Sequence, residues 1–142
     1  MQRKTLADAE CPIARSLERV GEWWSILIMR DALHGLRRFD EFSRSLDIAP
    51  NMLTRRLNSL VEDGLLERRA YSERPLRHEY VPTAKGEDFG GVLLAFVAWG
   101  NRHYAPEGES VQIVERATGR RVEPVIADMS DGRLLSLGEC TV

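Results

Sequence analysis

From Ile48 to Gly64 the chain reads Ile-Ala-Pro-Asn-Met-Leu-Thr-Arg-Arg-Leu-Asn-Ser-Leu-Val-Glu-Asp-Gly. On a helix of about 3.6 residues per turn, its apolar side chains share one side: Leu53, Leu57 and Leu60. Short amides and a guanidinium share the opposite side: Asn51, Arg55 and Asn58. The pattern predicts a helix that docks through leucines and offers groups able to hydrogen-bond base edges in a DNA major groove. An ordinary amphipathic surface helix shows the same division, so the neighbouring segments must decide between a DNA-reading helix and a surface helix.

Three further helices are expected before this one. Apolar residues spaced i, i+4, i+7 follow Pro12 and predict a short first helix: Ile13, Leu17 and Val20. Residues 23–33 are apolar on almost all sides, which predicts a buried central helix that ends at Gly35. Phe39, Phe42 and Leu46 predict a third helix, and only residues 47–49 separate it from the helix at 50–63. Two helices joined by so short a turn form a helix-turn-helix.

A β-hairpin is expected next. Residues 65–71 and 76–81 can pair as antiparallel strands around the polar sequence Ser72-Glu-Arg-Pro75. We interpret this hairpin as a wing, on or beside which lie Arg69, Arg74, Arg77 and His78. Arginines on a hairpin are often merely exposed to solvent. Whether these arginines indicate DNA binding therefore depends on the helix beside them.

A long helix and a tail complete the chain. Thr83 is a good N-cap for a helix over residues 84–104, whose apolar residues cover more of its perimeter than one small domain can bury. Such a helix is expected to meet a partner, most simply its own copy across a two-fold axis. After a linker at 106–110, short strands are expected at 111–116, 121–126 and 133–137, separated by turns at Thr118-Gly119 and Asp131-Gly132. These features predict one domain over residues 1–106 and a small β-hairpin extension over 107–142.

Composition excludes several classes of function. In 142 residues, 43% are hydrophobic and no apolar run reaches membrane-spanning length, so we expect a cytoplasmic protein without a membrane partner. The formal net charge is −2, and residues 37–77 carry nine arginines against seven acids, so DNA binding requires the arginines to share one face. No metal-binding, nucleotide-binding or hydrolytic motif occurs, so we expect no enzyme, no metal and no cofactor.

Eight motifs, in chain order, carry a family resemblance over residues 10–104. They are Cys11-Pro-Ile-Ala-Arg-Ser-Leu17, Trp24-Ser-Ile-Leu-Ile-Met-Arg30, Arg37-Arg-Phe-Asp-Glu-Phe42, Ile48-Ala-Pro-Asn-Met-Leu-Thr-Arg-Arg-Leu57, Glu62-Asp-Gly-Leu65, Pro75-Leu-Arg-His-Glu-Tyr80, Thr83-Ala-Lys-Gly86 and Trp99-Gly-Asn101. In order and spacing they closely resemble the HxlR family of bacterial transcriptional regulators. The resemblance implies an α+β, mainly helical fold: a MarR-like winged helix-turn-helix, with a long C-terminal dimerisation helix and, in this chain, a small β-rich extension.

The same resemblance implies a homodimer that binds double-stranded DNA at a pseudo-palindromic operator, with the helix at 50–63 in the major groove. Asn51, Arg55 and Asn58 are the candidates for base edges. The candidates for phosphates are Arg37, Arg38, Thr54, Arg56, Arg74 and Arg77. Met52 and Arg69 complete the predicted DNA-binding set. Arg56 lies nearer the apolar stripe, so a salt bridge to Glu62 or Glu67 is its structural alternative.

Two features suggest control by an effector. Some family members sense oxidants through a cysteine near the N-terminus, and Cys11 stands at the matching position; a small buried structural cysteine is the alternative. Trp23, Trp24, Phe96 and Trp99 could line a ligand pocket between the long helix and the winged-helix body, with core packing as the alternative.

The tail and the wing each depart from the family pattern. No cysteines occupy the tail turns, so a zinc ribbon is unsupported. Pro82 stands where the family usually has an apolar strand residue, and we expect it to end the second wing strand one residue early.

A protein-interaction module that kept the winged-helix shape without binding DNA is the alternative function.

Overall fold

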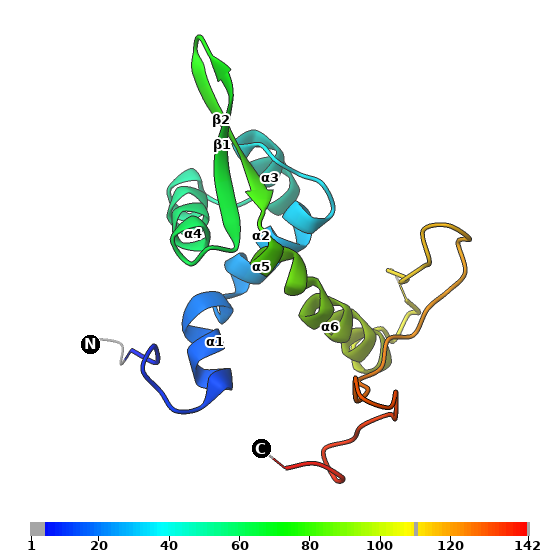
Figure 1. Ribbon diagram of the computed structural model, residues 1–142. Helices are drawn as coiled ribbons and strands as arrows, with labels where there is room; N and C mark the ends of the chain where they lie inside the picture. The colour runs from blue at the N-terminus through cyan, green and yellow to red at the C-terminus, as the bar shows by residue number, and fades with distance from the viewer. Residues whose placement is uncertain (1–4, 110, 142) are drawn as a thin grey trace. The chain divides into compact units, whose positions relative to one another are not determined.

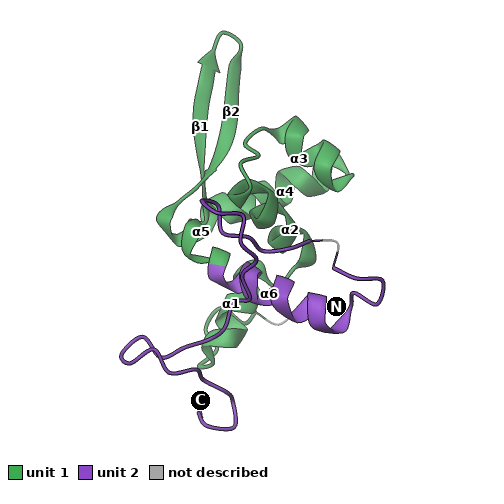
Figure 2. Ribbon diagram, turned by 90° about the vertical axis from the view of Figure 1, so that its right-hand side faces the viewer, with its two compact units in different colours: residues 1–90 green, residues 91–142 purple. Residues whose placement is uncertain are grey.

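The computed structural model describes residues 5–109 and 111–141, and the chain divides into two compact units, residues 1–90 and 91–142 (Figure 2). The elements follow one another in a simple order (Figure 1): α1 (Pro12–Val20), α2 (Trp23–Leu33), α3 (Phe39–Leu46), α4 (Pro50–Glu62), β1 (Leu66–Glu73), β2 (Leu76–Pro82), α5 (Ala84–Asp88) and α6 (Gly90–His103). The bounds of α1 and α3 are those that the apolar spacing predicts, and α2 covers the predicted apolar residues but ends at Leu33, two residues before Gly35. No helix of the described residues is long and apolar enough to cross a membrane.

The core of the first unit forms around α2, which contacts α1, α3, α4 and β2. Its fully buried side chains come from α2, α3, α4 and the start of β1: Ile28, Met29, Ala32, Phe42, Leu53, Leu57, Leu60 and Leu66. The leucine stripe of α4 therefore faces the core as predicted, and burying each leucine contributes roughly 1.5–3 kcal/mol.

A tight turn joins α3 to α4. Asp47 ends α3 with φ 49° and ψ 42°, a left-handed conformation that aspartate tolerates better than most residues. Ile48 in the same turn is buried, and Pro50 begins α4 at a position where its missing N–H is not needed. The predicted helix-turn-helix is confirmed.

The wing is the antiparallel pair β1 and β2, which projects beyond the helices in Figure 1. The expectation for Pro82 was wrong: it is the last residue of β2 and pairs with Leu66. The backbone N–H of Thr83 donates to the carbonyl oxygen of Leu65 at 3.1 Å, so Leu66 and Pro82 form a pair that exchanges no hydrogen bonds. Proline loses nothing at such a position.

The single long helix expected at 84–104 is in fact two helices, α5 and α6, separated at Phe89. Gly90 and Gly91 follow the break, and glycine lowers helix stability by about 1 kcal/mol relative to alanine. The predicted N-cap is confirmed, because the Thr83 hydroxyl accepts a hydrogen bond from the backbone N–H of Gly86 at 3.1 Å. Gly86 is buried, and a Cβ there would collide with the carbonyl oxygen of Leu65, so the close approach of α5 to the residue before β1 requires glycine.

The described part of the tail forms turns in place of the three predicted strands. Two isolated bridges, Val114 with Arg121 and Ala127 with Leu134, each close a turn that contains a glycine of positive φ. The backbone hydrogen bonds of the first turn recur in the second, 13 residues further on (114 to 127, 121 to 134). Apolar side chains beside the second turn stay exposed, so the tail segments lack the packed face that extends a bridge into a strand.

Candidate nucleic-acid interface

One face of α4 is free of the core. Its polar side chains are exposed on the side opposite the buried leucines, and we call them the α4 ridge: Asn51, Thr54, Arg55 and Asn58. Met52 lies beside the ridge but is half-buried and packs against the core. The ridge thus offers hydrogen-bonding groups on a helix whose other face is fixed by leucines on successive turns.

Two ion pairs hold α4 in place at its middle and its end. Arg56 Nε lies 3.1 Å from Glu22 Oε2, and both side chains are about three-quarters buried. Asp63, which follows α4, pairs with Arg19 at 3.5 Å. The alternative that Arg56 forms a salt bridge within the protein therefore holds, but its partner is Glu22 rather than Glu62 or Glu67. Glu22 also accepts a hydrogen bond from the Ser25 N–H at the start of α2, which ties α4 to that helix end.

Arg37 points into the protein. Its Nη1 donates to the carbonyl oxygen of Ala32 at 2.5 Å and to that of Leu36 at 3.0 Å. Ala32 lies in the last turn of α2, where backbone oxygens lack α-helical partners, and Leu36 lies in the segment just after the helix. The guanidinium of Arg37 therefore caps α2, and phosphate binding would have to compete with these bonds.

Arg38 remains exposed, but its guanidinium has a partner on the wing: Cζ lies 4.6 Å from the centre of the Tyr71 ring. Its backbone N–H and that of Arg37 both donate to Glu41 Oε2, at 2.9 and 2.7 Å. These two N–H groups hold the pKa of Glu41 below its usual value, because they stabilise the carboxylate form. The start of α3 is therefore capped by an ionised Glu41 at neutral pH.

The wing arginines differ in whether they form an ion pair within the protein. Arg69 is paired with Glu67 at 3.1 Å, which raises the pKa of Arg69 and lowers that of Glu67. Arg74 at the tip and Arg77 on β2 are exposed. Within residues 5–109 and 111–141, neither they nor Arg55 form an ion pair.

Arg68 was missed by the reasoning from sequence. It is exposed on β1 and forms no ion pair with any described residue. Side chains alternate between the two faces of a strand, so Arg68 and Arg69 point to opposite faces. The signal in the sequence was the position of Glu67, two residues before Arg69 and therefore on the same face of the strand, where it can pair with Arg69 but not with Arg68.

Cys11 is exposed at the N-cap of α1, so the alternative of a buried structural cysteine was wrong. Trp23 and Trp24 lie edge to face in the first unit, with ring centres 6.0 Å apart. Phe96 and Trp99 belong to the second unit, where they border an open hollow with Val92 and Ala95. That all four aromatic residues share one pocket stays a prediction.

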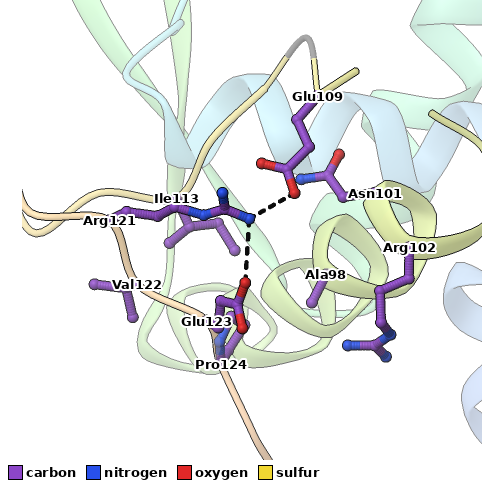
Figure 3. Close-up of a pocket in the computed structure, with 9 residues that line it drawn as sticks. All are labelled: Ala98, Asn101, Arg102, Glu109, Ile113, Arg121, Val122, Glu123 and Pro124. Carbon is purple, nitrogen blue, oxygen red and sulfur yellow. Dashed lines mark hydrogen bonds and ion pairs between the residues drawn. The ribbon is translucent and has the colours of Figure 1, made fainter. Parts of the chain in front are cut away.

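A polar pocket of about 70 Å³ lies in the second unit, and Figure 3 shows the residues that line it. Arg121 Nη2 lies 2.6 Å from Glu109 and 3.1 Å from Glu123, so its charge is neutralised inside the pocket. Asn101 of α6 donates to the carbonyl oxygen of Val111 at 2.9 Å. These contacts fix the tail to the end of α6, and a structural role accounts for them.

A helix-turn-helix with an adjoining two-stranded wing defines the class of winged-helix proteins. The model of the HxlR-like helix-turn-helix family matches residues 19–109, which is more than half of the chain. The chain belongs to this family and is a helix-turn-helix transcriptional regulator.

Three similar proteins illustrate the relationship. Rv3095 of Mycobacterium tuberculosis, an uncharacterised HTH-type transcriptional regulator, is 39% identical over 113 residues, which are 79% of this chain and 72% of that protein. The structure of PA1374 from Pseudomonas aeruginosa, described as a candidate transcription factor, is 77% identical, with a TM-score of 0.68 over 93% of this chain and 90% of that one. PA1607, also a candidate transcription factor, is 38% identical, with a TM-score of 0.88 over 98% of both chains.

Proposed function

We propose that the protein binds a specific, pseudo-palindromic DNA operator as a homodimer and thereby regulates transcription. One observation carries the proposal: the leucines of α4 are fully buried while Asn51, Arg55 and Asn58 on its other face are exposed. A helix anchored in this way can enter a major groove without disturbing the core, and its amides and guanidinium match the donor and acceptor pattern of base edges.

The residues divide by role. We assign Asn51, Arg55 and Asn58 to base edges, because they share the exposed ridge. We assign Thr54 on the ridge, and Arg74 and Arg77 on the wing, to phosphates, because hydroxyl and guanidinium contacts to the DNA backbone position the protein on the duplex. Arg37, Arg56 and Arg69 already bind groups of the protein, so any phosphate contact by them is secondary to a structural role.

Exposed apolar surface supports the homodimer. Helix α1 has no buried residue, and its Ile13 and Leu17 are 65% and 48% exposed. On α6, three apolar side chains lie within two turns and are each about half exposed: Val92, Phe96 and Trp99. Such surfaces are typical of an interface, and a two-fold dimer places two α4 helices about one helical turn of DNA apart. In this proposal residues 1–106 carry DNA binding and dimerisation, and 107–142 form an appended extension.

Selection of bound sequences from random duplex DNA tests the proposal. We expect an inverted repeat whose half-sites are separated by about one turn of DNA, roughly 10 base pairs, and a dimeric particle in solution. Enrichment of an unpaired half-site, or a strictly monomeric particle, would contradict the homodimer.

A protein-interaction module is the second candidate, and exposed apolar side chains of the tail favour it: Val125, Ile126, Leu134 and Leu137. A gel shift with genomic fragments at low salt separates the two functions. An interaction module leaves the DNA unretarded at every protein concentration, whereas a regulator retards it, and more weakly as salt increases.

We also propose that oxidation of Cys11 weakens DNA binding. Its exposed thiol begins α1, next to the apolar residues assigned to the dimer, and conversion to a sulfenic acid places a polar group at that surface. Treatment with peroxide is expected to lower the DNA affinity of the wild type and of Cys140→Ser, the matched control, but not of Cys11→Ser. An equal loss in all three proteins, or none in any, would remove Cys11 as a sensor.

A further inference from the structure

Both strands of the wing are joined to the segment between α2 and α3 by side-chain and backbone contacts. We call the residues involved the wing clamp: Arg37, Arg38, Glu41, Tyr71 and Tyr80. We propose that the wing clamp sets the position of the wing relative to the α4 ridge, and that Arg38 acts on DNA binding as a positioning residue through Tyr71. This inference rests on the proposed DNA-binding function, and it changes the role expected for Arg38.

The first attachment is on β2. The backbone N–H of Tyr80 donates to the carbonyl oxygen of Arg37 at 2.7 Å. Tyr80 pairs with Arg68 at a position where the β2 N–H points away from β1, so this bond costs the hairpin nothing. The side chain of Arg37 donates in turn to the carbonyl oxygen of Ala32 in the last turn of α2, so β2 is connected to a helix of the core.

The second attachment is on β1. The register of the hairpin shifts between Ala70 and Ser72, so Tyr71 is the extra residue of a β-bulge. Bulges redirect a side chain and increase the local twist of a strand. The redirected Tyr71 ring lies against the guanidinium of Arg38, 4.6 Å from Cζ, as in a cation–π contact.

The segment that holds Arg38 is itself fixed. The carboxylate of Glu41 accepts the backbone N–H groups of Arg37 and Arg38, and Arg38 is the N-cap of α3. Helix α3 leads directly into α4, so the clamp connects the wing to the helix-turn-helix. Beyond Tyr71 the hairpin tip is held by its own pairs, Ser72 with Arg77 and Glu73 with Leu76. The place of Arg74 relative to Arg55 therefore depends on the contact between Arg38 and Tyr71.

A double-mutant cycle on DNA affinity tests the inference, using the full chain and a sequence enriched by selection. Tyr71→Leu is expected to weaken binding roughly 2- to 5-fold, the value of an exposed cation–π contact, and to lower the salt slope, because the misplaced tip no longer contacts its phosphate. Tyr71→Phe keeps the ring and is expected to bind as the wild type does. Arg38→Gln is expected to cost less in the Tyr71→Leu protein than in the wild type.

A second cycle reports on the position of the wing. If the clamp positions the tip, Arg74→Ala should cost less affinity in the Tyr71→Leu protein than in the wild type. In the Tyr71→Leu protein the misplaced Arg74 has already lost its contact with a DNA phosphate. Thermal unfolding of each variant identifies any that has lost the fold, and Tyr71 is exposed enough for its replacement to leave the core intact.

Additive effects in both cycles would overturn the inference, and a salt slope lowered by about 1 with Arg38→Gln but unchanged with Tyr71→Leu would make Arg38 a phosphate ligand. Equal losses for Tyr71→Phe and Tyr71→Leu would also overturn it, because the hydroxyl rather than the ring would then matter. These outcomes differ from failure of the proposed function, in which the wild type itself does not retard DNA and both proposals fall.

Discussion

Replacing Leu57 with alanine is expected to lower the free energy of unfolding by about 2–5 kcal/mol. Leu57 is fully buried at the middle of α4, where the helix contacts α2, and truncation to alanine leaves a cavity that the surrounding side chains fill only in part. A loss of this size is a large share of the stability of a small domain. Thermal and urea unfolding of the purified variant measure it.

Asn58→Ala is the matched control, because Asn58 is the next residue on the same helix and is exposed on the ridge. We expect its stability to stay within about 0.5 kcal/mol of the wild type, while its DNA affinity falls. Equal destabilisation by the two substitutions would mean that α4 does not present its leucines and its amides to different surroundings.

Arg55→Ala is expected to cost about 1–3 kcal/mol of binding free energy, or roughly 5- to 150-fold in affinity, and to relax specificity at one base pair of each half-site. Arg55 is exposed on the ridge and forms no ion pair with the described residues, so its guanidinium is available for a bidentate bond to a base. Competition binding with duplexes that carry each base at each position measures the loss.

Arg74→Ala is the matched control for Arg55→Ala, because each substitution removes one arginine charge. It removes a cation from the wing tip rather than from the ridge, so it should weaken binding to all sequences alike and reduce the salt slope by about 1. If both substitutions caused equal losses that were independent of sequence and salt, the division into base and phosphate contacts would be wrong.

Local patterns predicted the helices of the first unit well. The spacing of Leu53, Leu57 and Leu60 identified the buried face of α4, and Pro12 and Thr83 identified helix starts, because such signals act within one or two turns of the chain. The α4 ridge followed from the same periodicity, since whatever the core does not bury on a helix faces outward.

Contacts between distant segments could not be predicted in the same way. The inward orientation of the Arg37 side chain and the ion pair between Arg56 and Glu22 depend on how the helices pack against one another. No short-range pattern distinguishes an arginine that caps a helix from one that binds a DNA phosphate. The β-bulge that brings Tyr71 to Arg38 likewise depends on the register of the hairpin.

The predicted long helix and tail strands failed for a common reason. Period and composition indicate which structure a segment favours, but neighbouring packing decides whether it forms. The helix breaks at Phe89, just before two glycines that weaken the start of α6, and the tail segments form single bridges because their apolar residues remain exposed.

Methylation protection on the selected operator tests most directly whether the α4 ridge enters the major groove. Dimethyl sulfate methylates guanine N7, which lies in that groove, so we expect protected guanines in both half-sites and loss of protection at one guanine of each half-site with Arg55→Ala. A stable complex in which guanine N7 stays fully reactive, or in which Arg55→Ala changes no protection, would contradict entry of the ridge into the groove.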